Sequence, residues 1–194
     1  MNKFLKLLLI ISILINFSNL AVFADENLDV QKKEIVALYN ANKLEDAYRL
    51  IAQVDETKRD AELWLILSNI TQDYGNSDDS IGFLTKSIQK DPKYYKAYYN
   101  LGNIYFEQNK VVKAIENYKL ALKYNKEMPF IYYNLGCVYL KDAQFAKAKT
   151  NFMKAISLKN NEKDFYYNLA LTYKKMGKDK QAQKALDLYN QLSG

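Results

Sequence analysis

The sequence contains no histidine and only one cysteine among its 194 residues. Histidine is the commonest general base and metal ligand of proteins, and a single thiol cannot build a thiolate metal site. Neither a phosphate-binding glycine loop nor a nucleophile elbow occurs in the sequence. We therefore expect a protein that is not an enzyme and that carries no cofactor and no metal.

Proline and glycine are also scarce, with two prolines and six glycines in the whole chain. Disordered and turn-rich chains contain far more of both residues. No stretch stands out for the alternation of apolar and polar residues that is typical of strands, whereas apolar residues recur at helical spacing. The sequence predicts an all-α fold.

The single cysteine, Cys137, directly follows Gly136 in a predicted helix. With no second cysteine, it cannot form a disulfide within the chain. One reading of such a thiol is a small packing residue. The other is an intermolecular disulfide or a redox-sensitive thiol in an oxidising compartment.

The chain is dominated by a repeated tetrapeptide, Tyr-Tyr-Asn-Leu. Its three copies begin at Tyr98, Tyr132 and Tyr166, so each starts 34 residues after the one before. A fixed period of this length is typical of a solenoid, in which one supersecondary unit stacks on the next.

Each copy belongs to a longer pattern that predicts two helices. Residues at i, i+3, i+4 and i+7 share one face of an α-helix, and in the first copy these are Tyr98, Leu101, Gly102 and Tyr105. A second apolar stripe follows after residues 108–110, with the residues Ala114, Tyr118 and Ala121. Because the loop between the stripes is short, the two helices must run antiparallel.

This pattern resembles the tetratricopeptide repeat, in which an aromatic residue, Leu-Gly and Tyr are followed by Ala, an aromatic residue, Ala and a closing Pro. Four units in register cover residues 61–94, 95–128, 129–162 and 163–194. Before them we expect a degenerate helix pair over residues 25–60, with a turn about one residue short. The resemblance implies a right-handed α-solenoid of antiparallel helix pairs.

The resemblance also implies that the first helices line a concave groove. Within Tyr-Tyr-Asn-Leu, the second tyrosine and the asparagine lie about 100° and about 200° around the helix from the first tyrosine. We assign the first tyrosine and the leucine to the core, and the other two residues to the groove. With a partial further row, the predicted peptide-binding residues are Asn69, Tyr99, Asn100, Asn103, Tyr133, Asn134, Tyr167 and Asn168.

Asparagine and tyrosine suit the binding of an extended peptide. The carboxamide offers two donors and an acceptor carbonyl, which match a backbone of any sequence. Tyrosine adds rigid amphipathic contact area. The same asparagines can instead form hydrogen bonds between repeats, and this alternative stays open.

Residues 1–24 have the pattern of a secretory signal peptide. Lys3 and Lys6 precede an apolar run over residues 7–15, and Ala24 stands at a suitable cleavage site before Asp25. We therefore expect an exported protein, periplasmic or secreted. The alternative is an uncleaved membrane anchor, because residues 4–24 are long enough to span a bilayer.

Charge is unevenly distributed along the chain. Residues 25–94 contain 9 basic and 14 acidic residues, whereas residues 95–194 contain 17 lysines and 8 acidic residues. This is either a solvated exterior or a dipole that steers an acidic partner or an anionic membrane surface to the C-terminal repeats. Since only two of the basic residues are arginines, nucleic acid is not an expected partner.

The last predicted helix carries Leu188 and Leu192 off its apolar stripe. We expect both leucines to be exposed and to offer a surface for self-association.

The features combined predict an exported scaffold or adaptor that binds an extended segment of a partner protein in its concave groove, in envelope assembly or secretion. Two alternatives remain. One is a structural subunit of an envelope complex that uses its convex face and ends. The other is an accessory partner of a separate enzyme.

Overall fold

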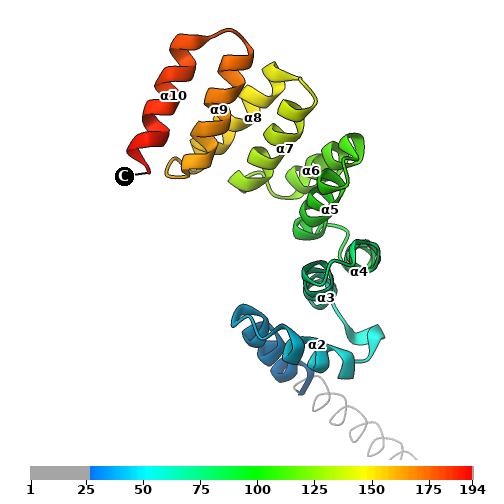
Figure 1. Ribbon diagram of the computed structural model, residues 1–194. Coiled ribbons are helices and arrows are strands. Elements are labelled where there is room, and N and C mark those ends of the chain that lie inside the picture. The colour runs from blue at the N-terminus through cyan, green and yellow to red at the C-terminus, as the bar shows by residue number, and fades with distance from the viewer. Residues whose placement is uncertain (1–26, 194) are drawn as a thin grey trace, which may run out of the picture.

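The computed structural model describes residues 27–193, which form an arc of antiparallel helix pairs with no strand among them (Figure 1). The first pair is a helix over residues 27–40 and α2 (Leu44–Gln53), followed by the 3-10 turn η1 (Glu56–Lys58). The later helices are α3 (Ala61–Asp73), α4 (Ser77–Lys90), α5 (Tyr95–Glu107), α6 (Val111–Tyr124), α7 (Pro129–Lys141), α8 (Phe145–Leu158), α9 (Lys163–Lys175) and α10 (Asp179–Gln191). The predicted all-α solenoid is confirmed.

The predicted signal peptide over residues 1–24 lies outside the described residues. Among residues 27–193, no helix combines the length and hydrophobicity that a bilayer-spanning segment needs.

The N-terminal pair differs from the others in its second helix. Its loop, residues 41–43, has three residues, as do the loops at 74–76, 108–110, 142–144 and 176–178. The expected short turn was therefore wrong. The shortening lies in α2, which has 10 residues, whereas α4 has 14.

Every loop within a pair has its middle residue in the left-handed region, at Asn42, Gly75, Asn109, Ala143 and Gly177. The next residue then donates its N–H to a carbonyl five residues back, as from Lys110 to Tyr105 at 2.7 Å. This turn satisfies carbonyls that the end of a helix leaves free, and glycine and asparagine adopt it most easily. Its recurrence gives each pair the same antiparallel geometry.

In two of the pairs, a glycine of the first helix faces an aromatic ring of the second helix. A Cβ atom at Gly102 would lie 2.6 Å from ring carbons of Tyr118, and one at Gly136 would lie 2.7 Å from the ring of Phe152. Both rings are fully buried. Hence glycine is required at these positions for its small size.

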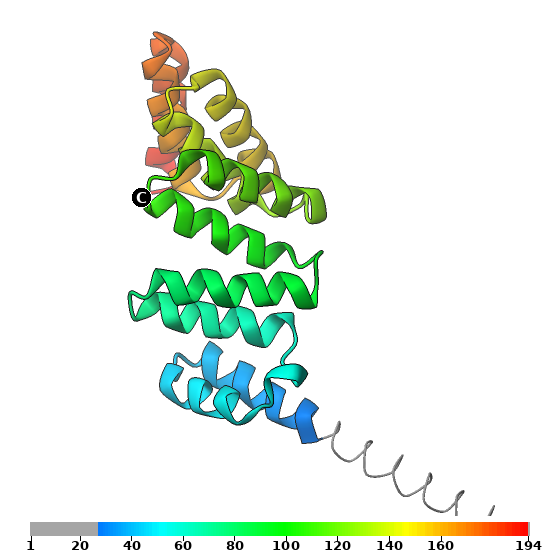
Figure 2. The same ribbon diagram turned by 90° about the vertical axis from the view of Figure 1, so that its right-hand side faces the viewer.

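Consecutive pairs stack through two kinds of helix–helix contact. The second helix of each pair packs on the first helix of the next pair, as α6 does on α7 and α8 on α9. First helices also contact one another across a repeat, α5 with α7 and α7 with α9. The first helices therefore follow the inner side of the arc (Figures 1 and 2).

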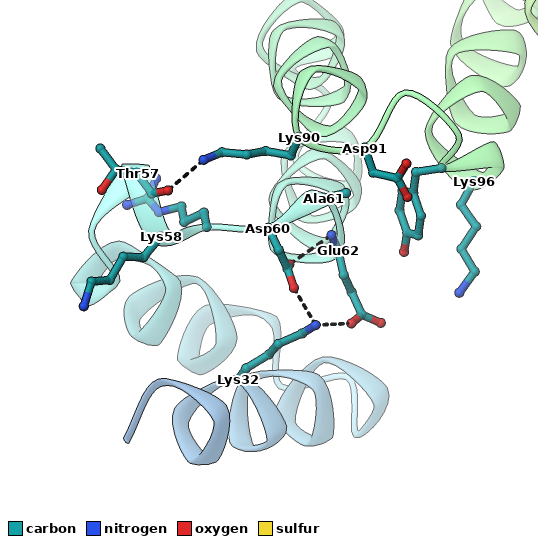
Figure 3. Close-up of a pocket in the computed structure, with 11 residues that line it drawn as sticks. Lys32, Thr57, Lys58, Asp60, Ala61, Glu62, Lys90, Asp91 and Lys96 are labelled. Atoms are coloured by element: carbon teal, nitrogen blue, oxygen red, sulfur yellow. Dashed lines mark hydrogen bonds and ion pairs between the residues drawn. The ribbon is translucent and has the colours of Figure 1, made fainter. Parts of the chain in front are cut away.

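The N-terminal pair is joined to α3 by an ion-paired cluster (Figure 3). Lys32 Nζ lies 2.6 Å from Asp60 Oδ2 and 2.8 Å from Glu62 Oε2. Asp60 also accepts hydrogen bonds from the N–H groups of Glu62 and Leu63, which caps α3. Partial burial lowers the pKa of Lys32, but the two carboxylates outweigh it and raise that pKa above its usual range. Lys32 thus holds the N-terminal pair to α3 through two ion pairs.

Gly102→Val should lower the free energy of unfolding by about 1–3 kcal/mol, because the added atoms collide with the Tyr118 ring. The measurement is denaturation by urea. Gly82→Ala is the control, since Gly82 is in α4 with no atom near its missing Cβ, and it should stabilise by about 1 kcal/mol. Equal changes in the free energy of unfolding would contradict the close contact between Gly102 and the Tyr118 ring.

Candidate binding groove

The eight predicted site residues all lie on first helices, and therefore along the inner side of the arc. Asn69 is on α3, and the others follow on α5, α7 and α9. Three of them, Asn69, Asn100 and Asn103, line one cleft of about 300 Å³. The remaining five lie on α5, α7 and α9, so the predicted site is a row of residues along the solenoid.

The asparagine amides connect each repeat to the one before it. Asn100 Nδ2 donates to Asn69 Oδ1 at 2.6 Å, and Asn69 Nδ2 in turn donates to Tyr39 Oη at 2.9 Å. Asn134 Nδ2 donates to Asn103 Oδ1 at 2.9 Å and to Tyr99 Oη at 3.1 Å. The alternative of hydrogen bonding between repeats is thus realised in the structure.

Three of the asparagines, Asn100, Asn134 and Asn168, leave their carboxamide oxygen free. Asn69 uses both of its polar side-chain atoms, and Asn103 accepts through its Oδ1. Among the hydrogen bonds of the described residues, Oδ1 of Asn100, Asn134 and Asn168 accepts none, and none of these oxygens is buried. Asn168 Nδ2 donates to Tyr133 Oη at 2.8 Å and to the Asp164 carbonyl oxygen at 3.3 Å. Since a carbonyl only accepts, this contact fixes the orientation of the amide. The row therefore offers acceptors.

The second tyrosines are packing residues as well as groove residues. The Tyr133 ring stacks on Phe165 of the next repeat with centroids 4.8 Å apart, and the Tyr99 ring lies 6.0 Å from that of Tyr118. Burial raises the pKa of Tyr99 and of Tyr133. Both hydroxyls thus stay protonated and can donate as well as accept. Tyr167, in the last described repeat, is 48% exposed.

The first tyrosines were assigned to the core, and this assignment holds only in part. Tyr166 is buried, but Tyr98 and Tyr132 are only half-buried. Tyr98 donates its hydroxyl to the Pro92 carbonyl at 3.1 Å, and Tyr166 donates to that of Asn160 at 2.9 Å. The hydroxyls of Tyr98 and Tyr166 thus bind the loop that precedes their helix.

Three polar residues of the groove were missed by the sequence reasoning. Gln72, Asp73 and Glu107 line the same cleft as Asn69 and Asn100. Gln72 Nε2 donates to Glu107 Oε2 at 3.1 Å, which joins α3 to α5. The repeat period could have identified two of them, because Asp73 and Glu107 are 34 residues apart and so occupy the same position in successive repeats.

Cys137 occupies the repeat position of Asn69 and Asn103, two periods after the first and one period after the second. Burial raises the pKa of its thiol to about 11. Little reactive thiolate exists at neutral pH with such a pKa. The structure thus favours the packing role over the redox role.

Leu188 and Leu192 are exposed, with 44% and 40% of their surfaces accessible. Leu188 also lines a largely apolar hollow of about 330 Å³ formed by α8, α9 and α10, together with Met153, Ile156, Tyr166, Leu169 and Tyr173. The expected exposure is thus confirmed, and self-association stays a prediction.

Asn134→Ala should lower the free energy of unfolding by about 1–3 kcal/mol, because it removes two hydrogen bonds between repeats. Asn117→Ala is the matched control, since that amide bonds only to Lys113 in its own helix. The control should change stability by less than about 0.5 kcal/mol. Thermal and urea unfolding of both variants measure the difference, and an Asn134 variant as stable as the control would rule out the bridging role.

Leu188→Lys combined with Leu192→Lys should abolish any dimer, because it places two charges on the exposed apolar surface. Light scattering measures the mass of both proteins across a concentration series. If the wild-type chain associates and the double variant associates equally well, these two leucines do not form the self-association surface.

Comparisons with known proteins agree with this architecture. A model described as TPR repeat matches residues 102–142, and models described as tetratricopeptide repeat match residues 83–116, 131–162 and 164–193. A crystal structure of MamA is 26% identical and aligns with a TM-score of 0.72 over 81% of this chain and 92% of that chain. The structure of MamA from AMB-1 is 22% identical, with a TM-score of 0.71 over 87% of this chain and 93% of that chain. The matched repeats cover more than half of the sequence and form a protein-interaction scaffold. The chain belongs to the tetratricopeptide repeat family.

Proposed function

We propose that this scaffold binds an extended segment of a partner protein along its concave groove. The observation that supports this is the row of free acceptors, one Oδ1 atom each on Asn100, Asn134 and Asn168. An extended backbone presents N–H donors at regular intervals, and these match such a row whatever the sequence of the segment.

The energetics favour a moderate affinity. Each hydrogen bond from the bound backbone contributes about 0.5–1.5 kcal/mol net. Ordering the segment consumes part of that gain. Three such bonds with accompanying side-chain contacts suggest a dissociation constant in roughly the micromolar range. Such an affinity suits an adaptor that releases its partner.

We further propose that the protein acts outside the cytoplasm, in envelope assembly or secretion. The support for this is the pattern of residues 1–24, with two lysines before an apolar run and a small residue before Asp25. A scaffold of helical repeats is typically non-catalytic. The alternatives of a structural subunit that uses the convex face, and of an accessory partner of a separate enzyme, are distinguished by where the partner makes contact.

Site-specific photocrosslinking in the cells that produce the protein tests this proposal. One photoreactive residue replaces Lys141, which is on α7 and shares the repeat position of the groove residue Glu107. The matched control replaces Lys119, which is also an exposed lysine and lies on the second helix α6. We expect adducts from position 141, mapped by mass spectrometry to one continuous segment of a partner. Adducts from position 119 without any from position 141 would contradict the proposal and support a structural subunit.

A further inference from the structure

The last described helix pair, α9 and α10, has an apolar face on which no described helix packs (Figure 1). A hollow of about 210 Å³ in this face is lined by Tyr167, Ala170, Leu171, Lys174, Ala182 and Leu186. Of these residues, Tyr167 is 48% exposed and Leu171 is 36% exposed. We call the surface formed by the six residues the end face.

In the preceding repeat, a helix covers the equivalent surface. Tyr133 precedes Tyr167 by one period and is half-buried, and Phe152 precedes Leu186 by one period and is fully buried. The covering helix there is α9, which packs against both α7 and α8. The end face therefore continues an interface that recurs along the solenoid, and a helix is the element that this interface accepts.

Each covering helix brings an asparagine to a tyrosine hydroxyl of the first helix before it. Asn134 Nδ2 donates to Tyr99 Oη at 3.1 Å, and Asn168 Nδ2 donates to Tyr133 Oη at 2.8 Å. Tyr167 is the next member of this series, and no described residue donates to its hydroxyl. An asparagine on a helix that covers the end face would continue the series.

The covering helix also contacts the preceding first helix through its own last residue. Glu107, the last residue of α5, accepts a hydrogen bond from Gln72. Lys141, the last residue of α7, has its Nζ 5.2 Å from the centre of the Phe106 ring. Gln72 and Phe106 share one repeat position, and Lys174 occupies it two repeats after Phe106. The last residue of a helix on the end face would therefore meet an ammonium group, which favours an acidic residue there.

A tyrosine reduces the space at one side of the end face. Tyr189 stands one period after Ala155, and its ring centre lies 5.4 Å from that of Tyr167. In the preceding repeat, beside the smaller Ala155, the Phe165 ring stacks on Tyr133 with centroids 4.8 Å apart. Because a tyrosine replaces the alanine, less room is left for a residue equivalent to Phe165. A small residue such as alanine suits this position.

End-to-end stacking of a second copy would not supply such a helix. The helix over residues 27–40 would continue the solenoid of another copy, but Lys33 and Glu34 on it are exposed. Counted back from the turns at Asn42 and Gly75, Glu34 occupies the position of the buried Leu67. Stacking would therefore bury a carboxylate where every later repeat buries a leucine, and this is unfavourable.

We propose that the end face binds an amphipathic helix of a partner protein, seated as each first helix is seated on the pair before it. The bound helix carries a small apolar residue, then an asparagine three residues later followed directly by a leucine, and an acidic residue at its last turn. This surface is separate from the groove, so the inference does not depend on the proposed function.

The chain itself contains a helix with this pattern. Among α3, α5, α7 and α9, α5 alone has all four features, at Ala97, Asn100, Leu101 and Glu107. The first and last of these positions are Phe165 and Lys175 in α9. The two helices therefore provide a matched pair of probes for the end face.

Binding of two helix-stabilised peptides to the full chain tests the proposal. One has the sequence of α5, Tyr95–Glu107, and the other has the sequence of α9, Lys163–Lys175. We expect the α5 peptide to bind roughly tenfold more tightly, because the α9 peptide would bring a lysine to Lys174 and a phenylalanine to Tyr189. Fluorescence anisotropy measures both dissociation constants.

Substitutions in the full chain locate the bound peptide. Leu171→Lys should abolish binding of the α5 peptide, because it places a charge in the apolar hollow. The control is Val112→Lys, since Val112 is an exposed apolar residue of α6, outside the end face. Lys174→Glu should weaken binding roughly fivefold, and a peptide with Glu107→Lys should restore it. Thermal unfolding verifies that the variants remain folded.

Several results would overturn the proposal. They are an α5 peptide that does not bind the wild-type chain, one that binds Leu171→Lys as tightly as the wild type, and equal binding of the two peptides. A wild-type dimer that Leu171→Lys dissociates, measured by sedimentation equilibrium, would assign the end face to a second copy and overturn it as well. None of these results bears on binding in the groove.

Discussion

The hydrogen bond from an asparagine amide to the preceding repeat determines both how the solenoid stacks and what its inner face offers. Asn134 illustrates this double role. Its nitrogen is held by Asn103 and Tyr99, which fixes the approach of α7 to α5. Because the nitrogen is fixed, the oxygen has to face away from the preceding repeat. A structural bond thereby orients a row of acceptors, so the residues that connect the repeats are also those of the proposed binding site.

Close packing within each pair makes this arrangement possible. Gly102 and Gly136 leave room for the rings of Tyr118 and Phe152, which fill the interior of their repeats completely. The Tyr118 hydroxyl then donates to Asn103 Oδ1 at 2.7 Å, so the oxygen that accepts from Asn134 is itself held from within its own repeat. The core and the inner face are thus connected through Asn103.

The fold could be predicted because its determinants recur at a fixed period. Tyr98, Leu101, Gly102 and Tyr105 define a helix face by spacing alone, and the next copies repeat it. The partners of the asparagines could not be predicted, since spacing places Asn134 on a helix face but does not say which side chain meets it. The same reason hid Gln72, whose role depends on a contact with Glu107 of the next repeat. The position of the shortening in the first pair was also missed, because the end of α2 carries no glycine or proline to mark it.

The crystal structure of the chain bound to a peptide selected on it tests the central claim most directly. We expect an extended peptide along the first helices. Its backbone N–H groups should lie within hydrogen-bond distance, about 3 Å, of Oδ1 of Asn100, Asn134 and Asn168, and the asparagine amides should keep their bonds to the preceding repeats. A peptide seated on the second helices, or one that displaces those amides from Tyr99 and Tyr133, would contradict it.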